Sequence, residues 1–176
     1  METEAVQERP QHPYWLRFIV GKNPAWTVAR ILFVIFVAFA LTKFVFIPIR
    51  VTGDSMLPTF HNGQIKFVNK LSYLKHKPQR GDIVGVRYSS KRVLLLKRII
   101  GLPGETYQVR SGEIFINGEK IEEPYAHGKI TSREGKGVGW TDPVKLDSNE
   151  YFVLGDNRPV SEGYIKYEHE IVGKVL

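Results

Sequence analysis

The chain has 176 residues, 43% of them hydrophobic, which is enough for one globular domain with a buried core and an additional segment. It contains no cysteine, which excludes disulfide bonds, thiolate metal sites and a cysteine nucleophile, and its five histidines lack the close spacing of zinc ligands, so we expect no metal or cofactor. The formal net charge is +7, but the basic residues are dispersed without an aromatic-interleaved stripe, which argues against nucleic-acid binding.

One segment near the N-terminus is apolar enough to cross a bilayer. Residues 31–41 read ILFVIFVAFAL, and the apolar character continues to residue 47. Because the segment is apolar on every face, a buried core helix is disfavoured, and it begins too late and runs too long for a removable signal peptide. We predict a short N-terminal segment at residues 1–24 and a transmembrane anchor at residues 25–49, with Pro48 as its stop.

The flanking charges indicate the orientation of this anchor. Arg17, Lys22 and Arg30 precede or open the apolar segment, and positive residues next to a span tend to stay in the cytoplasm. A long folded domain is translocated largely regardless of its own charge. We therefore expect a single-pass protein of the cell (cytoplasmic) membrane, with a cytoplasmic N-terminus and residues 50–176 outside.

From residue 50 onward the pattern predicts β-strands. Alternating or continuous short apolar runs, punctuated by Gly and Pro, occur at residues 64–69, 82–88, 93–100, 106–110, 150–154 and 171–176. Asn117-Gly118 between two short apolar runs is a strong hairpin signal. The polar residues 122–147 are expected to form a long loop or excursion. The fold class is thus mostly β, with an antiparallel sheet.

The first candidate for chemistry is Ser55, which follows the apolar segment closely. It lies in a turn-like setting between Gly53 and Pro58. A serine hydroxyl is a poor nucleophile unless a base removes its proton, and backbone N–H groups at such a turn are able to stabilise an oxyanion. Alone this signal is weak, since a serine in a Gly/Pro loop is usually only a turn residue.

Lys97 is the candidate base. With a period of two, it shares one strand face with Val93, Leu95 and Ile99, so it points toward an apolar surface. Burial disfavours the ammonium, and the lowered pKa suits a general base, whereas the neighbouring Arg98 stays protonated and faces the other side. A lysine that extends to solvent at a strand edge is the alternative interpretation.

A third motif follows a predicted strand at residues 155–161 and is rich in polar turn residues. Asp156 and Arg158 are expected to pair with each other, and Asn157 is expected to hold backbone groups. The alternative is an ordinary β-turn with a surface ion pair.

In this order, behind one apolar segment, the three motifs resemble those of bacterial type I signal peptidases, the Ser–Lys proteases that remove signal peptides. The resemblance covers about residues 25–176. The family's Ser-Met-x-Pro-Thr, Lys-Arg-x-x-Gly-x-Pro-Gly and Gly-Asp-Asn-Arg motifs are matched here by residues 55–59, 97–104 and 155–158. Their characteristic side chains are Ser55, Met56, Pro58, Thr59, Lys97, Arg98, Gly155, Asp156, Asn157 and Arg158.

The resemblance implies a mechanism as well as a fold of the signal peptidase type. Ser55 is the implied nucleophile, Lys97 the base, and Ser161 the residue that orients the base, while the Ser55 N–H and a donor near Gly53 bind the oxyanion. The implied substrates are exported preproteins with small side chains at the cleavage position and two before it. The implied enzyme uses an acyl-enzyme step without a cofactor and works at the lipid bilayer.

This chain departs from the family pattern at two places. Many members carry a serine where Gly53 stands, and the family often continues with Asp-Ser-Arg where this chain has residues 163–165, Gly-Tyr-Ile. The geometry near Ser161 is therefore expected to differ.

Three competing hypotheses stay open beside the Ser–Lys peptidase. A triad of Ser55 with His61 and Asp54 is disfavoured, because triads assemble from separate elements. A non-catalytic, membrane-anchored β-domain that binds a protein partner would keep the fold and lose the geometry of the dyad. A Ser–Lys protease dedicated to a single substrate would keep both.

Overall fold

The computed structural model describes residues 24–88, 94–131 and 142–176. The chain divides into two compact units, Met1–Leu41 and Thr42–Leu176, and each is described here by itself. The N-terminal residues 1–23, Val93 and residues 132–141 of the predicted loop lie outside the described residues.

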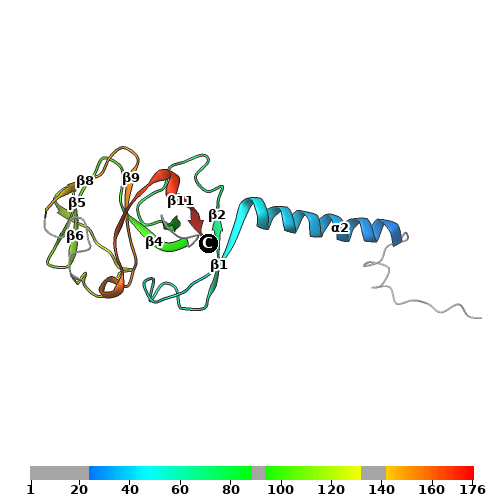
Figure 1. Cartoon of the computed structure of the whole chain (residues 1–176), viewed down its shortest axis with the longest axis horizontal. Helices are drawn as coiled ribbons and strands as arrows, with labels where there is room; N and C mark the ends of the chain where they lie inside the picture. Colours follow the sequence, from blue (N-terminus) through cyan, green and yellow to red (C-terminus); the bar gives the residue numbers. More distant parts are fainter. Residues whose placement is uncertain (1–23, 89–93, 132–141) are drawn as a thin grey trace, which may run out of the picture. The chain divides into compact units, whose positions relative to one another are not determined.

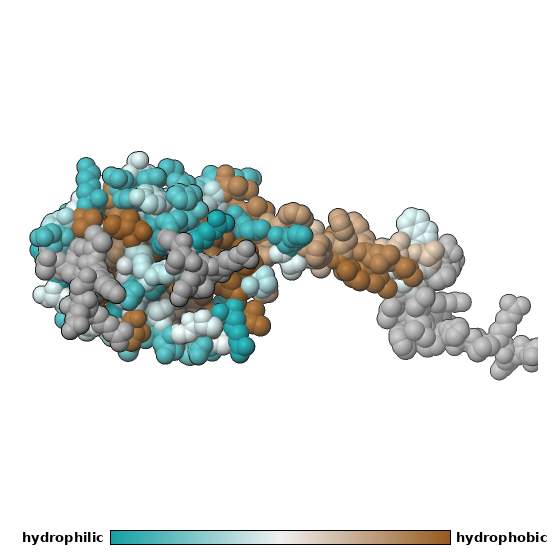
Figure 2. Space-filling view, viewed as in Figure 1, coloured by the Kyte–Doolittle hydropathy of each residue, from teal (hydrophilic) through white to brown (hydrophobic). Residues whose placement is uncertain are grey.

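The N-terminal apolar segment is a helix. Helix α2 covers Pro24–Ala40 and is followed by a π-helical turn, η1, at Leu41–Val45. Ala25–Val45 is long and apolar enough to cross a membrane, with a mean hydropathy of 2.3 and none of its most apolar window buried in the protein. Figure 2 shows apolar residues along this helix. The pattern fits a helix that contacts lipid rather than a core.

The helix is shorter than the sequence predicted. It ends at Val45, and strand β1 occupies Phe46–Arg50, so Pro48 does not stop a helix. β1 is an edge strand that pairs only with β2, and Pro48 lies opposite Phe67. An edge strand tolerates a proline because the missing N–H is not needed for a second partner.

The β-rich unit contains two sheets in which every described strand pair is antiparallel (Figure 1). The larger sheet has seven strands in the order β1-β2-β11-β3-β4-β9-β10. Besides β1, these are β2 (Ile65–Asn69), β3 (Ile83–Arg87), β4 (Leu94–Gly101), β9 (Glu150–Leu154), β10 (Tyr164–Tyr167) and β11 (Ile171–Val175). Short 3₁₀-helices, η2 (Arg158–Val160) and η3 (Glu168–Glu170), flank β10.

The smaller sheet has four strands in the order β7-β6-β5-β8. They are β5 (Thr106–Arg110), β6 (Glu113–Ile116), β7 (Glu119–Lys120) and β8 (Val144–Lys145). The predicted hairpin joins β6 to β7, and its two turn residues, Asn117 and Gly118, have φ values of 51° and 87°. A two-residue turn of this kind requires positive φ at both positions, which explains the Asn-Gly pair.

The mostly β, antiparallel fold behind one apolar helix is thus confirmed. Each strand that the sequence predicted is present within two residues of its expected bounds, whereas β1, β8 and β10 were missed. Strand β8 lies inside the stretch 122–147 that was predicted as a loop.

Two central strands of the large sheet are buried on both faces. On β9, Tyr151 and Val153 belong to one apolar cluster, while Phe152 and Leu154 belong to a second cluster that also contains β5 and β6 residues. On β4, Ile99 and Ile100 divide between the same two clusters. A strand with two buried faces reads as a continuous apolar run, which is the pattern of β9 after Glu150 and of β4 except at Lys97 and Arg98. A charged residue on β4 is therefore enclosed by the fold.

Candidate active site

Ser55 lies in a tight turn between β1 and β2. The turn is closed by hydrogen bonds from the Leu57 N–H to the Asp54 carbonyl (3.2 Å) and from the Phe60 N–H to the Met56 carbonyl (2.9 Å). Met56 is 2% exposed and packs in the core with Phe60, so the residue after the serine fixes the turn to the body of the domain. The backbone of Ser55 is held while the residue lines a cavity.

The 155–161 loop packs directly against this turn. Asn157 donates its backbone N–H to the Ser55 carbonyl (3.0 Å) and its side-chain amide to the Asp54 carbonyl (2.9 Å). A Cβ added to Gly155 would lie 2.3 Å from the Ser55 carbonyl oxygen and 2.4 Å from Ser161 Oγ. Only glycine fits this contact. The expectation that Asn157 holds backbone groups is confirmed.

Lys97 lies on β4, and its side chain contacts the 155–161 loop. Lys97 is 4% exposed, and its Nζ donates a hydrogen bond of 2.8 Å to Ser161 Oγ. The Gly155 N–H donates to the same oxygen at 2.7 Å, so the hydroxyl of Ser161 is fixed from two sides. The prediction that Lys97 points toward an apolar surface is confirmed, and the alternative of a solvent-extended lysine is wrong.

Burial changes the protonation of Lys97. Desolvation lowers the pKa of Lys97 to about 8, although the carboxylate of Glu162 opposes this effect. A lysine with such a pKa has an appreciable free-amine fraction near neutral pH, which a general base requires.

Ser55 and Lys97 line the same cavity of about 190 Å³. No hydrogen bond links their functional atoms among the described residues, although catalytic hydrogen bonds are commonly longer before a substrate is bound. The cavity lies between the segment after β1, the start of β4 and the start of β10. Its lining is Ile49, Arg50, Val51, Thr52, Gly53, Ser55, Met56, Leu94, Leu95, Leu96, Lys97, Val160, Glu162 and Tyr164.

The two remaining members of the alternative triad, Asp54 and His61, do not line this cavity. His61 is exposed and is not among the lining residues, so the structure does not support a triad with Ser55 and Asp54. Among the described residues, no three His, Cys, Asp or Glu side chains gather in a way that would hold a metal ion.

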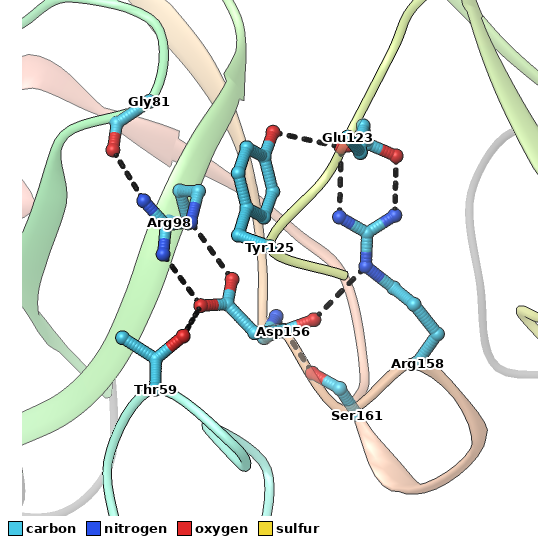
Figure 3. Close-up of polar contacts among 9 residues, drawn as sticks. Thr59, Gly81, Arg98, Glu123, Tyr125, Asp156, Arg158 and Ser161 are labelled. Carbon is cyan, nitrogen blue, oxygen red and sulfur yellow. Dashed lines mark hydrogen bonds and ion pairs between the residues drawn. The ribbon is translucent and has the colours of Figure 1, made fainter. Parts of the chain in front are cut away.

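Arg98 and Asp156 form a bidentate ion pair (Figure 3). Arg98 Nε and Nη2 donate to the two carboxylate oxygens at 2.8 and 2.6 Å, and Nη1 donates to the Gly81 carbonyl. Thr59 Oγ1 also donates to Asp156, which joins the Ser55 turn to this pair. The predicted pairing of Asp156 with Arg158 is therefore wrong, because Arg98 on the other face of β4 already satisfies the buried carboxylate.

Arg158 instead pairs with Glu123, a residue that the sequence did not indicate. The guanidinium donates to both Glu123 oxygens at 2.6 and 2.7 Å, and its Nε donates to the Gly155 carbonyl at 3.1 Å. The Tyr125 hydroxyl donates to Glu123, and its ring lies 4.0 Å from the Arg98 guanidinium. Thus one aromatic residue bridges two ion pairs that enclose the 155–161 loop (Figure 3).

The family is decided by the match over nearly the whole chain. A family model described as signal peptidase, peptidase S26, matches residues 25–174. The chain belongs to this family. The predicted resemblance and the predicted enzyme class, a peptidase of the signal peptidase I type, are confirmed.

Several signal peptidases are similar in sequence to this chain. Signal peptidase I T of Bacillus subtilis (strain 168) is 40% identical over 131 residues, which are 73% of this chain and 68% of that protein. Signal peptidase I of Bacillus licheniformis is 41% identical over 76% of this chain and 73% of its own length. A crystal structure of a signal peptidase I from Enterococcus faecalis V583 is 30% identical with a TM-score of 0.43, and covers 57% of this chain and 97% of that chain.

The departures from the family pattern have local physical explanations. Gly53 has a φ of 90°, a conformation in which a serine would be strained. At the second departure, an added Cβ on Gly163 would lie 2.8 Å from the ring of Phe152, and Ile165 packs against the cluster that contains Phe152. Apolar contacts therefore surround Gly163 and Ile165, and Tyr164 lines the cavity.

Proposed function

We propose that this signal peptidase removes N-terminal signal peptides from exported preproteins through a Ser55–Lys97 dyad and an acyl-enzyme. The observation that carries the proposal is a lysine, 4% exposed with its pKa lowered to about 8, in the same small cavity as the serine of the first motif. A buried lysine with a lowered pKa in a cavity shared with a serine is typical of a functional site, and its free-amine form can accept a proton.

The chemistry follows the general pattern of nucleophilic catalysis. Neutral Lys97 takes the Ser55 proton, and Ser55 Oγ attacks the carbonyl carbon at the end of the signal peptide. The Lys97 ammonium then protonates the leaving amine, and the free amine activates a water molecule for deacylation. Ser161 orients Lys97 through the 2.8 Å hydrogen bond to Nζ.

The backbone at the Ser55 turn supplies the oxyanion donors in this mechanism. The turn's own hydrogen bonds use the N–H groups of Leu57 and Phe60, which leaves the Ser55 N–H for the substrate among the described contacts. A second donor near Gly53 completes the site. Donors fixed in place before the reaction stabilise a developing oxyanion more strongly than water does.

The cavity is consistent with a preference for small side chains. Its volume is about 190 Å³, and branched apolar residues such as Ile49, Val51 and Leu95 form part of its wall. An extended peptide presents alternate side chains to one face. The side chains at the cleavage position and two before it would therefore both contact this cavity wall.

The helix Ala25–Val45 is proposed to anchor the enzyme in the cell membrane, with residues 1–24 in the cytoplasm and the β-rich unit outside. A signal peptide is itself embedded in the bilayer by its apolar core. Sharing a membrane raises the effective concentration of substrate without any new contact.

Cleavage of a precursor with a small-x-small site, in detergent, tests this function. We expect cleavage by the wild type and a loss of roughly 10³-fold or more in kcat for Ser55→Ala and for Lys97→Ala. Lys97→Arg is also expected to be inactive, because a guanidinium does not deprotonate. The matched controls Ser148→Ala and Lys145→Ala, both exposed, keep wild-type activity. A wild type that leaves the precursor intact would contradict the function, and an active Lys97→Ala would contradict the dyad.

A further inference from the structure

Among the cavity residues that lie outside the three sequence motifs are a carboxylate and a tyrosine directly after the third motif. Glu162 and Tyr164 follow Ser161 in the chain and line the cavity with Ser55 and Lys97. Tyr164 lies in the stretch 163–165, where the sequence analysis found a departure from the family pattern, and Glu162 directly precedes that stretch. A carboxylate and an aromatic ring next to a catalytic lysine both affect its charge, so these two side chains bear on the reaction.

The two side chains are joined to each other. The Tyr164 hydroxyl donates to Glu162 Oε2 at 2.6 Å, and the ring of Tyr88 packs edge-on against Tyr164 at a centroid distance of 5.9 Å. The Tyr164 ring centroid lies 5.6 Å from Lys97 Nζ, within the range of a cation–π contact. The backbone of Tyr164 pairs with β9, so the strand fixes the position from which the ring extends.

The other described groups near Lys97 and the Tyr164 ring are neutral or basic. Strand β3 places Val84 opposite Lys97, and the 155–161 loop contributes the hydroxyl of Ser161. The segment after β1 contributes Arg50 to the cavity, and Lys166 of β10 lies 5.9 Å from the centroid of the Tyr164 ring. Within the described part of the chain, the negative charge that acts on Lys97 comes from Glu162, which raises the pKa of Lys97 against the stronger lowering by burial.

We propose that Glu162 and Tyr164 are positioning residues for the base, which act as one hydrogen-bonded pair to stabilise the Lys97 ammonium that forms during acylation. This rests on the proposed function. In that step the O–H bond of Ser55 breaks, an N–H bond forms on Lys97 Nζ, and Ser55 Oγ bonds to the substrate carbonyl carbon. The pair itself exchanges no proton. Its negative charge and the π face of the ring favour the charged product of the proton transfer.

The pH dependence of kcat/KM, measured on the full chain in detergent, tests the pair. Glu162→Gln keeps the shape and the hydrogen-bond acceptor but removes the charge, so the acidic limb should move to lower pH by about 0.3 to 1 pH unit. Below the limb, the activity of the variant relative to its own plateau should exceed that of the wild type by about 2- to 10-fold. Tyr164→Phe releases the carboxylate and should give a smaller shift in the same direction, and the double variant should resemble Glu162→Gln alone.

The outcomes separate this inference from the proposed function. A wild type that does not cleave the precursor would contradict the proposed function. If the wild type cleaves but its limb coincides with that of Glu162→Gln, the positioning role is wrong. The control Glu119→Gln removes an exposed carboxylate on β7 and should leave the limb unchanged. A ¹³C NMR titration of lysine Cε in the Ser55→Ala background, with Lys97 assigned from Lys97→Ala, should show the same pKa decrease without any turnover. An unchanged Lys97 titration there would also overturn the inference.

Discussion

The burial of Lys97 affects both its proposed chemical role and the stability of the folded state. Its side chain is buried, which disfavours the ammonium, and it lines the same cavity as Ser55. The same burial therefore makes the amine available and destabilises the protein below the lysine's pKa. Both consequences are measurable.

The first consequence is a rate that rises with pH. Because the proposed base must be neutral, kcat/KM should increase through an acidic limb near the Lys97 pKa of about 8 and level off above it. Steady-state cleavage between about pH 5 and 10 measures this limb. The control His61→Gln should keep it, since His61 is exposed and outside the cavity. A limb near pH ~6.5 that disappears in His61→Gln would indicate a histidine base.

The second consequence is that Lys97→Met should be inactive but more stable. Burial lowers the pKa of Lys97 from 10.5 to about 8 in the folded state. Below pH 8 the lysine is charged in both states, so the full cost of the buried ammonium is present. Between pH 8 and 10.5 the unfolded state holds more protons, and wild-type stability rises with pH.

Thermal unfolding in detergent measures this effect. Lys97→Met should gain roughly 3 kcal/mol below pH 8, and the gain should shrink as the pH approaches 10.5. Exposed Lys145→Met serves as the control and should show no such pH-dependent gain. A Lys97→Met variant that is less stable than the wild type at about pH 7 would contradict the account.

At the scale of elements, the 155–161 loop is held from both sides. Asn157 connects it to the Ser55 turn, and Arg158 connects it to Glu123 in the segment after β7. The side chain of Arg158 is 3% exposed and that of Glu123 is 10% exposed. An ion pair this buried is costly to break from one side only, because the remaining charge stays buried.

Glu123→Gln should therefore destabilise the domain by about 3 kcal/mol. Because Arg158 Nε also holds the Gly155 carbonyl beside Ser161, kcat should fall more than KM changes. Urea unfolding and steady-state kinetics measure the two effects. The neighbouring exposed Glu122→Gln is the control. If Glu123→Gln matches this control in stability and rate, the ion pair does not hold the loop.

The sequence allowed the motif residues to be located but not all of their partners. Period-two alternation placed Lys97 on a buried face correctly, since that depends on local geometry alone. It paired Asp156 with Arg158 because the two are close in the chain, whereas the carboxylate is satisfied by Arg98 from another strand. Glu123 lies in a polar stretch without periodicity, so no local signal pointed to it. Strand β10 was missed because its alternation is short and follows a turn.

At the scale of the whole molecule, the helix and the β-rich unit have separable tasks. Deletion of residues 1–41 removes the apolar helix and retains all of the β-rich unit. We expect this variant to hydrolyse a short soluble peptide at a rate within about 3-fold of the full chain, because the cavity residues are all retained. Cleavage of a precursor embedded in vesicles should fall by about 10²-fold, because the enzyme and the precursor are no longer held in the same membrane. Equal losses on both substrates would contradict this separation.

The central claim is that Ser55 becomes acylated with Lys97 as its base. Intact-mass measurement after brief mixing of the wild type with a small-x-small precursor tests it most directly, followed by peptide mapping of the adduct. We predict an adduct on Ser55 equal to the signal-peptide fragment less one water, present in the wild type and absent from Ser55→Ala and Lys97→Ala. Cleavage by Ser55→Ala, or an adduct that maps to another residue, would contradict the account.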